Sequence, residues 1–109
     1  MIFPANLVVV SHSKVRDYLL KPLASDDKSN YMSLGGYSRD NWEELLKDII
    51  EYLSTKNAEL IEKTSYGDKY LIQGILPGTQ EGRNLYVDSI WQKDKFDDFY
   101  RFITLYPSR

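Results

Sequence analysis

The sequence predicts a single α+β domain over residues 1–109, in which two or three N-terminal helices pack on a C-terminal four-stranded antiparallel meander sheet. Apolar residues recur at helical spacing between residues 38 and 53, whereas the later part of the chain alternates apolar and polar side chains as strands do. Short links join the alternating segments, which favours antiparallel neighbours. The helical half is therefore expected at about residues 11–55 and the sheet half at about residues 58–106.

The first two expected helices are short. Ser13 can cap a helix that ends before Pro22, and residues 25–34 form the second helix. Gly35 and Gly36 end this second helix, because glycine takes the left-handed backbone conformation at little cost.

The third expected helix has the clearest pattern. Ser38 opens it, and two glutamates occupy its first turn, where the helix dipole favours negative charge. Its apolar residues follow at steps of three, one, three, one and three: Trp42, Leu45, Leu46, Ile49, Ile50 and Leu53. This spacing predicts an amphipathic helix with one stripe packed on the sheet.

Four strands are expected at residues 60–64, 69–76, 86–92 and 99–106, separated by turn-forming or charged segments. In the third strand, Trp91 shares a face with Val87 and Ser89. Two interpretations remain open for this tryptophan. It is either a core anchor beneath the long helix or the edge of a shallow binding cleft that small Ser89 leaves open.

Composition excludes several kinds of site. The chain has no cysteine and one histidine, which removes disulfides, thiol catalysis and zinc centres built on thiolates or several imidazoles. No metal or cofactor is expected. The formal net charge of −2 argues against a general nucleic-acid coat protein or a membrane-surface binder, although it leaves room for a local basic site.

The N-terminal segment predicts a cytoplasmic protein without a membrane span. No basic residue precedes its apolar run, and no small-residue cleavage site follows it. The longest unbroken apolar run, Leu7 to Val10, is far shorter than the roughly 20 residues that a spanning helix needs.

Several residue types suit a metal-independent ribonuclease. Such an enzyme needs cations to neutralise the scissile phosphate and a group that moves the 2′-hydroxyl proton. His12 is the side chain whose ordinary pKa lies nearest neutrality, and the nine tyrosines can stack bases. The alternatives are an exposed histidine beside a helix start and tyrosines that merely frame a sheet.

Two stretches resemble a known bacterial family. The first runs from Lys14 to Leu20 and continues through Lys28, Leu34 to Tyr37 and Trp42; the second comprises Thr64 to Tyr70, Val87 to Trp91 and Arg101 to Pro107. Together they resemble an uncharacterised domain family found as small stand-alone toxin–antitoxin-type proteins and at the C-terminal ends of filamentous-haemagglutinin-type adhesins. The resemblance implies a toxin-like role. The predicted layout, helices followed by an antiparallel sheet, is similar to that of barnase- and RelE-type ribonucleases.

The resemblance also assigns the family's polar positions. They fall on Lys14, Lys28, Tyr66, Trp91, Arg101, Thr104 and Tyr106. Positions 101 and 104 differ by an odd number, so one site can use both only if the strand contains a bulge or ends there. The chain departs from the family at Ala24 to Asp27, where the usual basic, histidine- and glycine-containing approach is replaced by acidic residues.

The leading hypothesis is a toxin-like, metal-independent endoribonuclease. Lys28 and Arg101 hold the phosphate, His12 or Tyr66 moves protons, and Thr104 orients the substrate. Lys14, Trp91 and Tyr106 complete the substrate-binding set. The expected partners are RNA and a cognate small antitoxin or immunity protein, with no membrane.

The alternative is a non-catalytic interaction module of the antitoxin or immunity type. The acidic residues Asp26, Asp27, Asp97 and Asp98 suit a protein that covers a basic partner.

Overall fold

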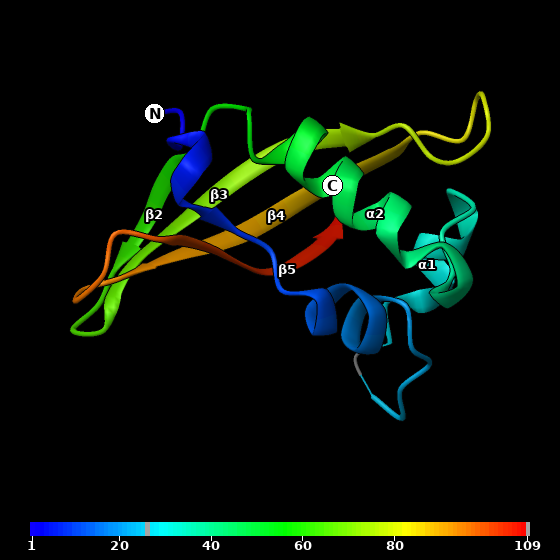
Figure 1. Ribbon diagram of the computed structural model, residues 1–109, viewed down its shortest axis with the longest axis horizontal. Coiled ribbons are helices and arrows are strands. Elements are labelled where there is room, and N and C mark those ends of the chain that lie inside the picture. Colours follow the sequence, from blue (N-terminus) through cyan, green and yellow to red (C-terminus); the bar gives the residue numbers. More distant parts are fainter. Residues whose placement is uncertain (26, 109) are drawn as a thin grey trace.

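The computed structural model describes residues 1–25 and 27–108. Its strands are β1 (Val8–Val9), β2 (Glu59–Lys63), β3 (Gly67–Leu76), β4 (Leu85–Asp94) and β5 (Tyr100–Pro107). They form one mixed sheet in the spatial order β1-β5-β4-β3-β2 (Figure 1). The pairs β2–β3, β3–β4 and β4–β5 are antiparallel, whereas β1 lies parallel to β5.

The expected fold class, a four-stranded antiparallel meander preceded by helices, is wrong. Val8 and Val9 form a fifth strand that pairs with Tyr100 and Arg101, and the main helical segments lie between this strand and β2. A two-residue strand is too short to show an alternating pattern, and its partner lies at the other end of the chain. The expected similarity to barnase- and RelE-type ribonucleases was inferred from the meander and does not hold for this topology.

The helical segments are η1 (Ala5–Leu7), η2 (Lys14–Leu19), α1 (Ser29–Leu34), η3 (Arg39–Asn41), α2 (Trp42–Asp48) and η4 (Ile49–Leu53). The long helix expected from Ser38 thus consists of three consecutive segments, η3, α2 and η4. The backbone N–H of Ser38 donates to Oδ1 of Asn41 at 2.7 Å, within a capping box that opens this helix. The second expected helix begins later than predicted, at Ser29, and Asp26 lies outside the described residues.

The core lies between the sheet and α2–η4, which cross one face of it (Figure 1). Leu45, Ile49 and Leu53 of the predicted apolar stripe are fully buried there. A Cβ on Gly74 of β3 would lie 2.6 Å from Cδ2 of Leu53, so glycine is what allows η4 to approach the strand this closely. On the opposite face of the sheet Tyr86 is largely exposed.

Candidate functional site

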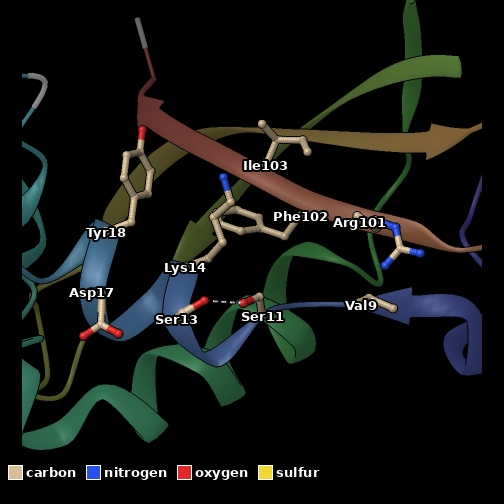
Figure 2. A pocket seen from close by; sticks show the side chains of 9 residues that line it. All are labelled: Val9, Ser11, Ser13, Lys14, Asp17, Tyr18, Arg101, Phe102 and Ile103. Carbon is tan, nitrogen blue, oxygen red and sulfur yellow. Dashed lines mark hydrogen bonds between the residues drawn. The ribbon is translucent and has the colours of Figure 1, made fainter. Parts of the chain in front are cut away.

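A pocket of about 400 Å³ lies between η2 and β5, just beyond the end of β1 (Figure 2). Its lining residues come from the segment after β1, from η2 and from β5: Val9, Ser11, Ser13, Lys14, Asp17, Tyr18, Arg101, Phe102 and Ile103. Among them are two of the sequence-predicted residues, Lys14 and Arg101. The pocket therefore brings together cations from opposite halves of the chain.

The short β1 strand leaves room for this pocket. Val9 still pairs with Arg101, but the chain then leaves the sheet and forms η2. Val15 and Leu19 of η2 are fully buried and fix the segment on the core. Lys14 and Tyr18 precede these anchors by one residue each, and both side chains extend toward β5 (Figure 2).

A β-bulge places two predicted residues on the same side of β5. Arg101 pairs with Gln92 and Thr104 pairs with Ile90, with a register shift between Ile90 and Trp91. Gln92 and Ile90 lie two residues apart on β4, so Arg101 and Thr104 occupy the same face of the sheet. In a regular strand, positions 101 and 104 would lie on opposite faces, and the bulge reverses this.

Tyr18 connects the pocket to Thr104. The Tyr18 and Thr104 hydroxyl oxygens lie 3.1 Å apart and share a hydrogen bond, and Thr104 is buried. The Lys14 ammonium lies 5.2 Å from the centroid of the Tyr18 ring, within the range of a cation–π contact. Lys14, Tyr18 and Thr104 therefore form a continuous chain of contacts from η2 to β5.

The Arg101 guanidinium is already held by acidic residues. Its Nη2 donates to Oδ2 of Asp97 at 2.9 Å, and its Nε lies 3.5 Å from Oδ2 of Asp94. The hydrogen bond from Arg101 lowers the pKa of Asp97 below its usual value. These carboxylates hold the Arg101 guanidinium in one orientation, and an anion in the pocket would share its positive charge with them.

Asp17 contributes a carboxylate at the rim. Its side chain points away from β5 in Figure 2 and accepts hydrogen bonds from Arg16 and Arg39. The hydrogen bond from Arg16 is the main reason that the pKa of Asp17 is lowered. Asp17 therefore stays ionised at neutral pH and is engaged with arginines outside the pocket.

Lys28 and Tyr106 form a second contact farther along β5. The Lys28 ammonium lies 4.6 Å from the centroid of the Tyr106 ring, and Lys28 is only 8% exposed. Tyr106 follows Thr104 by two residues on the same strand. Neither Lys28 nor Tyr106 lines the pocket that contains Arg101.

The remaining three predicted residues lie elsewhere. His12 is exposed, and its ring centroid lies 5.1 Å from that of Trp42 on α2. Tyr66 is 79% exposed in the turn between β2 and β3. Trp91 is fully buried and donates from Nε1 to the Ser89 hydroxyl at 2.8 Å, so its position is that of a core anchor.

Sequence reasoning missed Tyr18, together with Ser11 and Ser13, whose hydroxyls hydrogen-bond to each other at 2.8 Å. The available signal for Tyr18 was its helical spacing of four residues from Lys14. In residues 1–25 and 27–108, no group of three histidine, cysteine or acidic side chains is arranged to hold a metal ion. No helix in that same part of the chain is long and apolar enough to cross a membrane.

Comparison with known proteins gives a family but no activity. No curated protein and no solved structure matches the chain. One family model, described as a domain of unknown function (DUF6883), matches residues 3–109. Because this match covers nearly the whole chain, the protein belongs to the DUF6883 family of domains.

Proposed function

We propose that this chain is a toxin-like domain that acts as a metal-independent endoribonuclease at the pocket between η2 and β5. The observation that carries the proposal is the presence of Lys14 and Arg101 on opposite sides of one pocket, with the Tyr18 hydroxyl near its edge. Two cations at fixed positions suit a phosphodiester, whose negative charge grows during cleavage. The pocket volume of about 400 Å³ accommodates a phosphate and part of a nucleotide.

The reaction follows from RNA's own nucleophile. The 2′-hydroxyl oxygen attacks the adjacent phosphorus, and the bond from phosphorus to the 5′-oxygen breaks. The products are a 2′,3′-cyclic phosphate and a free 5′-hydroxyl. Lys14 and Arg101 neutralise the phosphate, the Tyr18 hydroxyl donates a proton to the leaving 5′-oxygen, and water takes the proton from the 2′-hydroxyl.

Thr104 serves as a positioning residue in this scheme. Its hydroxyl contacts Tyr18 Oη at 3.1 Å and lies in the buried part of β5. Tyr18 takes the proton-transfer role that the sequence suggested for His12 or Tyr66, because it lines the pocket and they do not. Lys28 and Tyr106 lie farther along the same strand, where they suit the binding of a neighbouring nucleotide.

A toxin-like role leads to two further proposals, on the compartment and on the partner. The domain acts in the cytoplasm, where its RNA substrate is found, and a small antitoxin or immunity protein neutralises it. A partner that covers the pocket would present acidic side chains to Lys14 and Arg101.

The test is tightly regulated expression of the wild-type chain and of single variants. We expect wild-type expression to arrest growth and to degrade RNA into fragments with cyclic phosphate ends. Lys14→Ala and Arg101→Ala should each lower cleavage of a purified RNA by about 10²-fold or more, as loss of a transition-state charge partner does. Tyr18→Phe removes the hydroxyl and should lower the rate without preventing RNA binding.

Lys21→Ala is the matched control for Lys14→Ala, because Lys21 is an exposed lysine just after η2 that does not line the pocket. Normal growth and intact RNA with a folded wild-type chain would contradict the proposal. Equal activity of Lys14→Ala and Lys21→Ala would show that the pocket is not the site of cleavage.

A second candidate is the non-catalytic interaction module. The face of the sheet opposite α2 favours it, because Ile75, Tyr86 and Tyr106 are each at least 44% exposed there. Co-expression with the product of a neighbouring gene tests this function. A stable complex that Tyr86→Asp abolishes, formed by a chain that leaves RNA intact, would favour the module over the enzyme.

A further inference from the structure

Two hairpin turns meet at one end of the sheet, far from α1 (Figure 1). One connects β2 to β3 and contains Tyr66, and the other connects β4 to β5 and contains Lys95 and Phe96. The backbone N–H of Lys95 donates to the Tyr66 carbonyl at 2.9 Å. This hydrogen bond holds the two turns together, so their side chains form one surface.

Two aromatic side chains on this surface are extended into solvent. Phe96 is 92% exposed and Tyr66 is 79% exposed, more than any other large hydrophobic residue in the described part of the chain. Isolated exposed apolar residues are common, but two largely exposed rings on turns that a hydrogen bond holds together are typical of binding surfaces. Both rings therefore offer largely exposed faces, and the Lys95 ammonium lies 5.9 Å from the centroid of the Phe96 ring.

Lysines surround a hollow of about 300 Å³ beside these rings. Lys63, Lys93 and Lys95 line it together with Asp68 and Asp94. Asp68 lies in register between Lys63 and Lys93. The Lys93 ammonium donates to the backbone carbonyl of Asp97 at 2.9 Å, which fixes one positive charge beside the hollow, and Asp94 lies 3.5 Å from Nε of Arg101. The surface formed by Lys63, Tyr66, Lys93, Lys95 and Phe96 is called the hairpin-tip surface below.

We propose that the hairpin-tip surface binds single-stranded RNA. Bases stack on the rings of Tyr66 and Phe96, and the three lysines contact the phosphates between them. Alternation of exposed rings and cations is the chemistry by which proteins bind unpaired nucleic acid without reading its sequence. A duplex would keep its bases stacked on each other and unavailable to these rings.

The turn that carries Phe96 also contacts Arg101, a residue of the pocket between η2 and β5. Arg101 lines that pocket, and its guanidinium carbon lies 5.5 Å from the centroid of the Phe99 ring. Phe99 is 40% exposed and follows Phe96 by three residues in the same turn. The inference therefore rests on the proposed function and deepens it: the substrate is single-stranded, and it extends from the pocket to the tip.

Binding is measured separately from cleavage, by fluorescence anisotropy with a labelled 2′-O-methyl oligoribonucleotide of about 12 nucleotides. This probe lacks the free 2′-hydroxyl and remains intact. Tyr66→Ala and Phe96→Ala should each raise the dissociation constant roughly tenfold, the effect of losing one stacked base. Tyr66→Phe retains the ring and should bind as the wild type does.

Two matched controls come from exposed residues elsewhere. Tyr86→Ala removes a 58% exposed tyrosine from β4 outside the tip and should leave the dissociation constant unchanged. Lys95→Ala should weaken binding, whereas Lys21→Ala should not. Because the tip side chains are exposed, thermal melting should confirm that all variants fold.

The outcomes separate this inference from the proposed function. Weaker binding by the tip variants supports the inference even if the wild-type chain cleaves no RNA. It is overturned if the wild-type chain does not bind the probe, or if Tyr66→Ala, Phe96→Ala and the controls bind equally. Equal affinity for the probe and for its duplex with a complementary strand would also overturn it, as would tip-dependent binding to vesicles of anionic lipid without binding to the probe.

Discussion

At the scale of single residues, a buried hydrogen bond joins Tyr37 to α2. The Tyr37 hydroxyl donates to Oδ2 of Asp48 at 2.6 Å and accepts from the backbone N–H of Gly78 at 3.1 Å. Gly78 has a φ of 77°, and a Cβ there would lie 2.5 Å from the Arg83 carbonyl oxygen, so this turn needs glycine. Burial raises the pKa of both Asp48 and Tyr37.

The raised pKa of Asp48 predicts a pH dependence of stability. In the folded chain Asp48 holds its proton at pH values where the unfolded chain has lost it. The protonated carboxyl therefore stabilises the folded chain. This stabilisation is fully present below about pH 4, the ordinary pKa of aspartate, and is lost as pH rises through the raised pKa of the folded chain. Asp48→Asn should remove that loss. The check is the free energy of unfolding in urea at pH 4.5 and pH 7, for both chains.

The difference between the two chains isolates Asp48, because the other carboxylates are common to both. An equal change with pH in the wild type and in Asp48→Asn would show that Asp48 ionises normally in the folded state.

Trp91 supports the core through its ring and its indole nitrogen. It packs edge-on against Phe102 at 5.3 Å between centroids, and the Ser89 hydroxyl that accepts from Nε1 donates in turn to the Ile72 carbonyl. We expect Trp91→Ala to destabilise the fold by about 3–5 kcal/mol. The measurement is the urea midpoint. An unchanged midpoint, together with weaker RNA binding, would instead make Trp91 a ligand-binding residue.

At the scale of elements, bulges shape both sides of the sheet. The bulge in β5 turns Thr104 to the face that carries Arg101, and a second bulge in β2 lies between Leu60 and Glu62. β2 is an edge strand with all five side chains exposed, and an edge of this kind can pair with other chains. The bulge and the charged side chains of β2 work against the pairing of this edge with a strand of another chain.

Contact between η4 and β3 gives an element-scale prediction. Gly74→Val would place a branched side chain where Leu53 already lies 2.6 Å from the Cβ position. Overpacking of this kind should cost about 1–3 kcal/mol, and Gly74→Ala should cost less than Gly74→Val. Thermal melting of the two variants checks the order. Equal stability of Gly74→Val and the wild type would mean that η4 moves away from the sheet at little cost.

At the scale of the whole molecule, ion pairs at the surface respond to acid in the opposite direction to Asp48. Hydrogen bonds from arginines lower the pKa values of Asp17 and Asp97. A lowered folded-state pKa gives stability that is present above about pH 4 and is lost as pH falls below it.

We therefore expect Asp97→Asn to reduce the loss of stability between pH 4 and pH 2, measured as the thermal midpoint at several pH values. The exposed pair contributes little at high ionic strength, so the difference between the variant and the wild type should shrink in added salt. A difference that grows in salt would contradict the assignment of the effect to the Asp97–Arg101 pair.

Much of the local structure was determined by the sequence alone. The apolar stripe from Trp42 to Leu53 predicted the long helix because its spacing matches one helical face, although Ile50 of that stripe is exposed. The strand pattern from residue 60 onward predicted every end of β2 to β5 to within two residues. Gly35 ended the second helix as expected. The helix, the strands and the helix end depend on residues close together in the chain, so the spacing of apolar and polar residues predicts them directly.

The tertiary structure alone decided how distant segments meet. Pairing of Val8–Val9 with β5 depends on residues at the opposite end of the chain, and no local pattern encodes it. The β5 bulge, which places Arg101 and Thr104 on one face, arises from register with β4 and is absent from the alternation itself. Tyr18 entered the candidate site for the same reason: helical spacing gave its face on η2, but only packing against β5 brought its hydroxyl to Thr104.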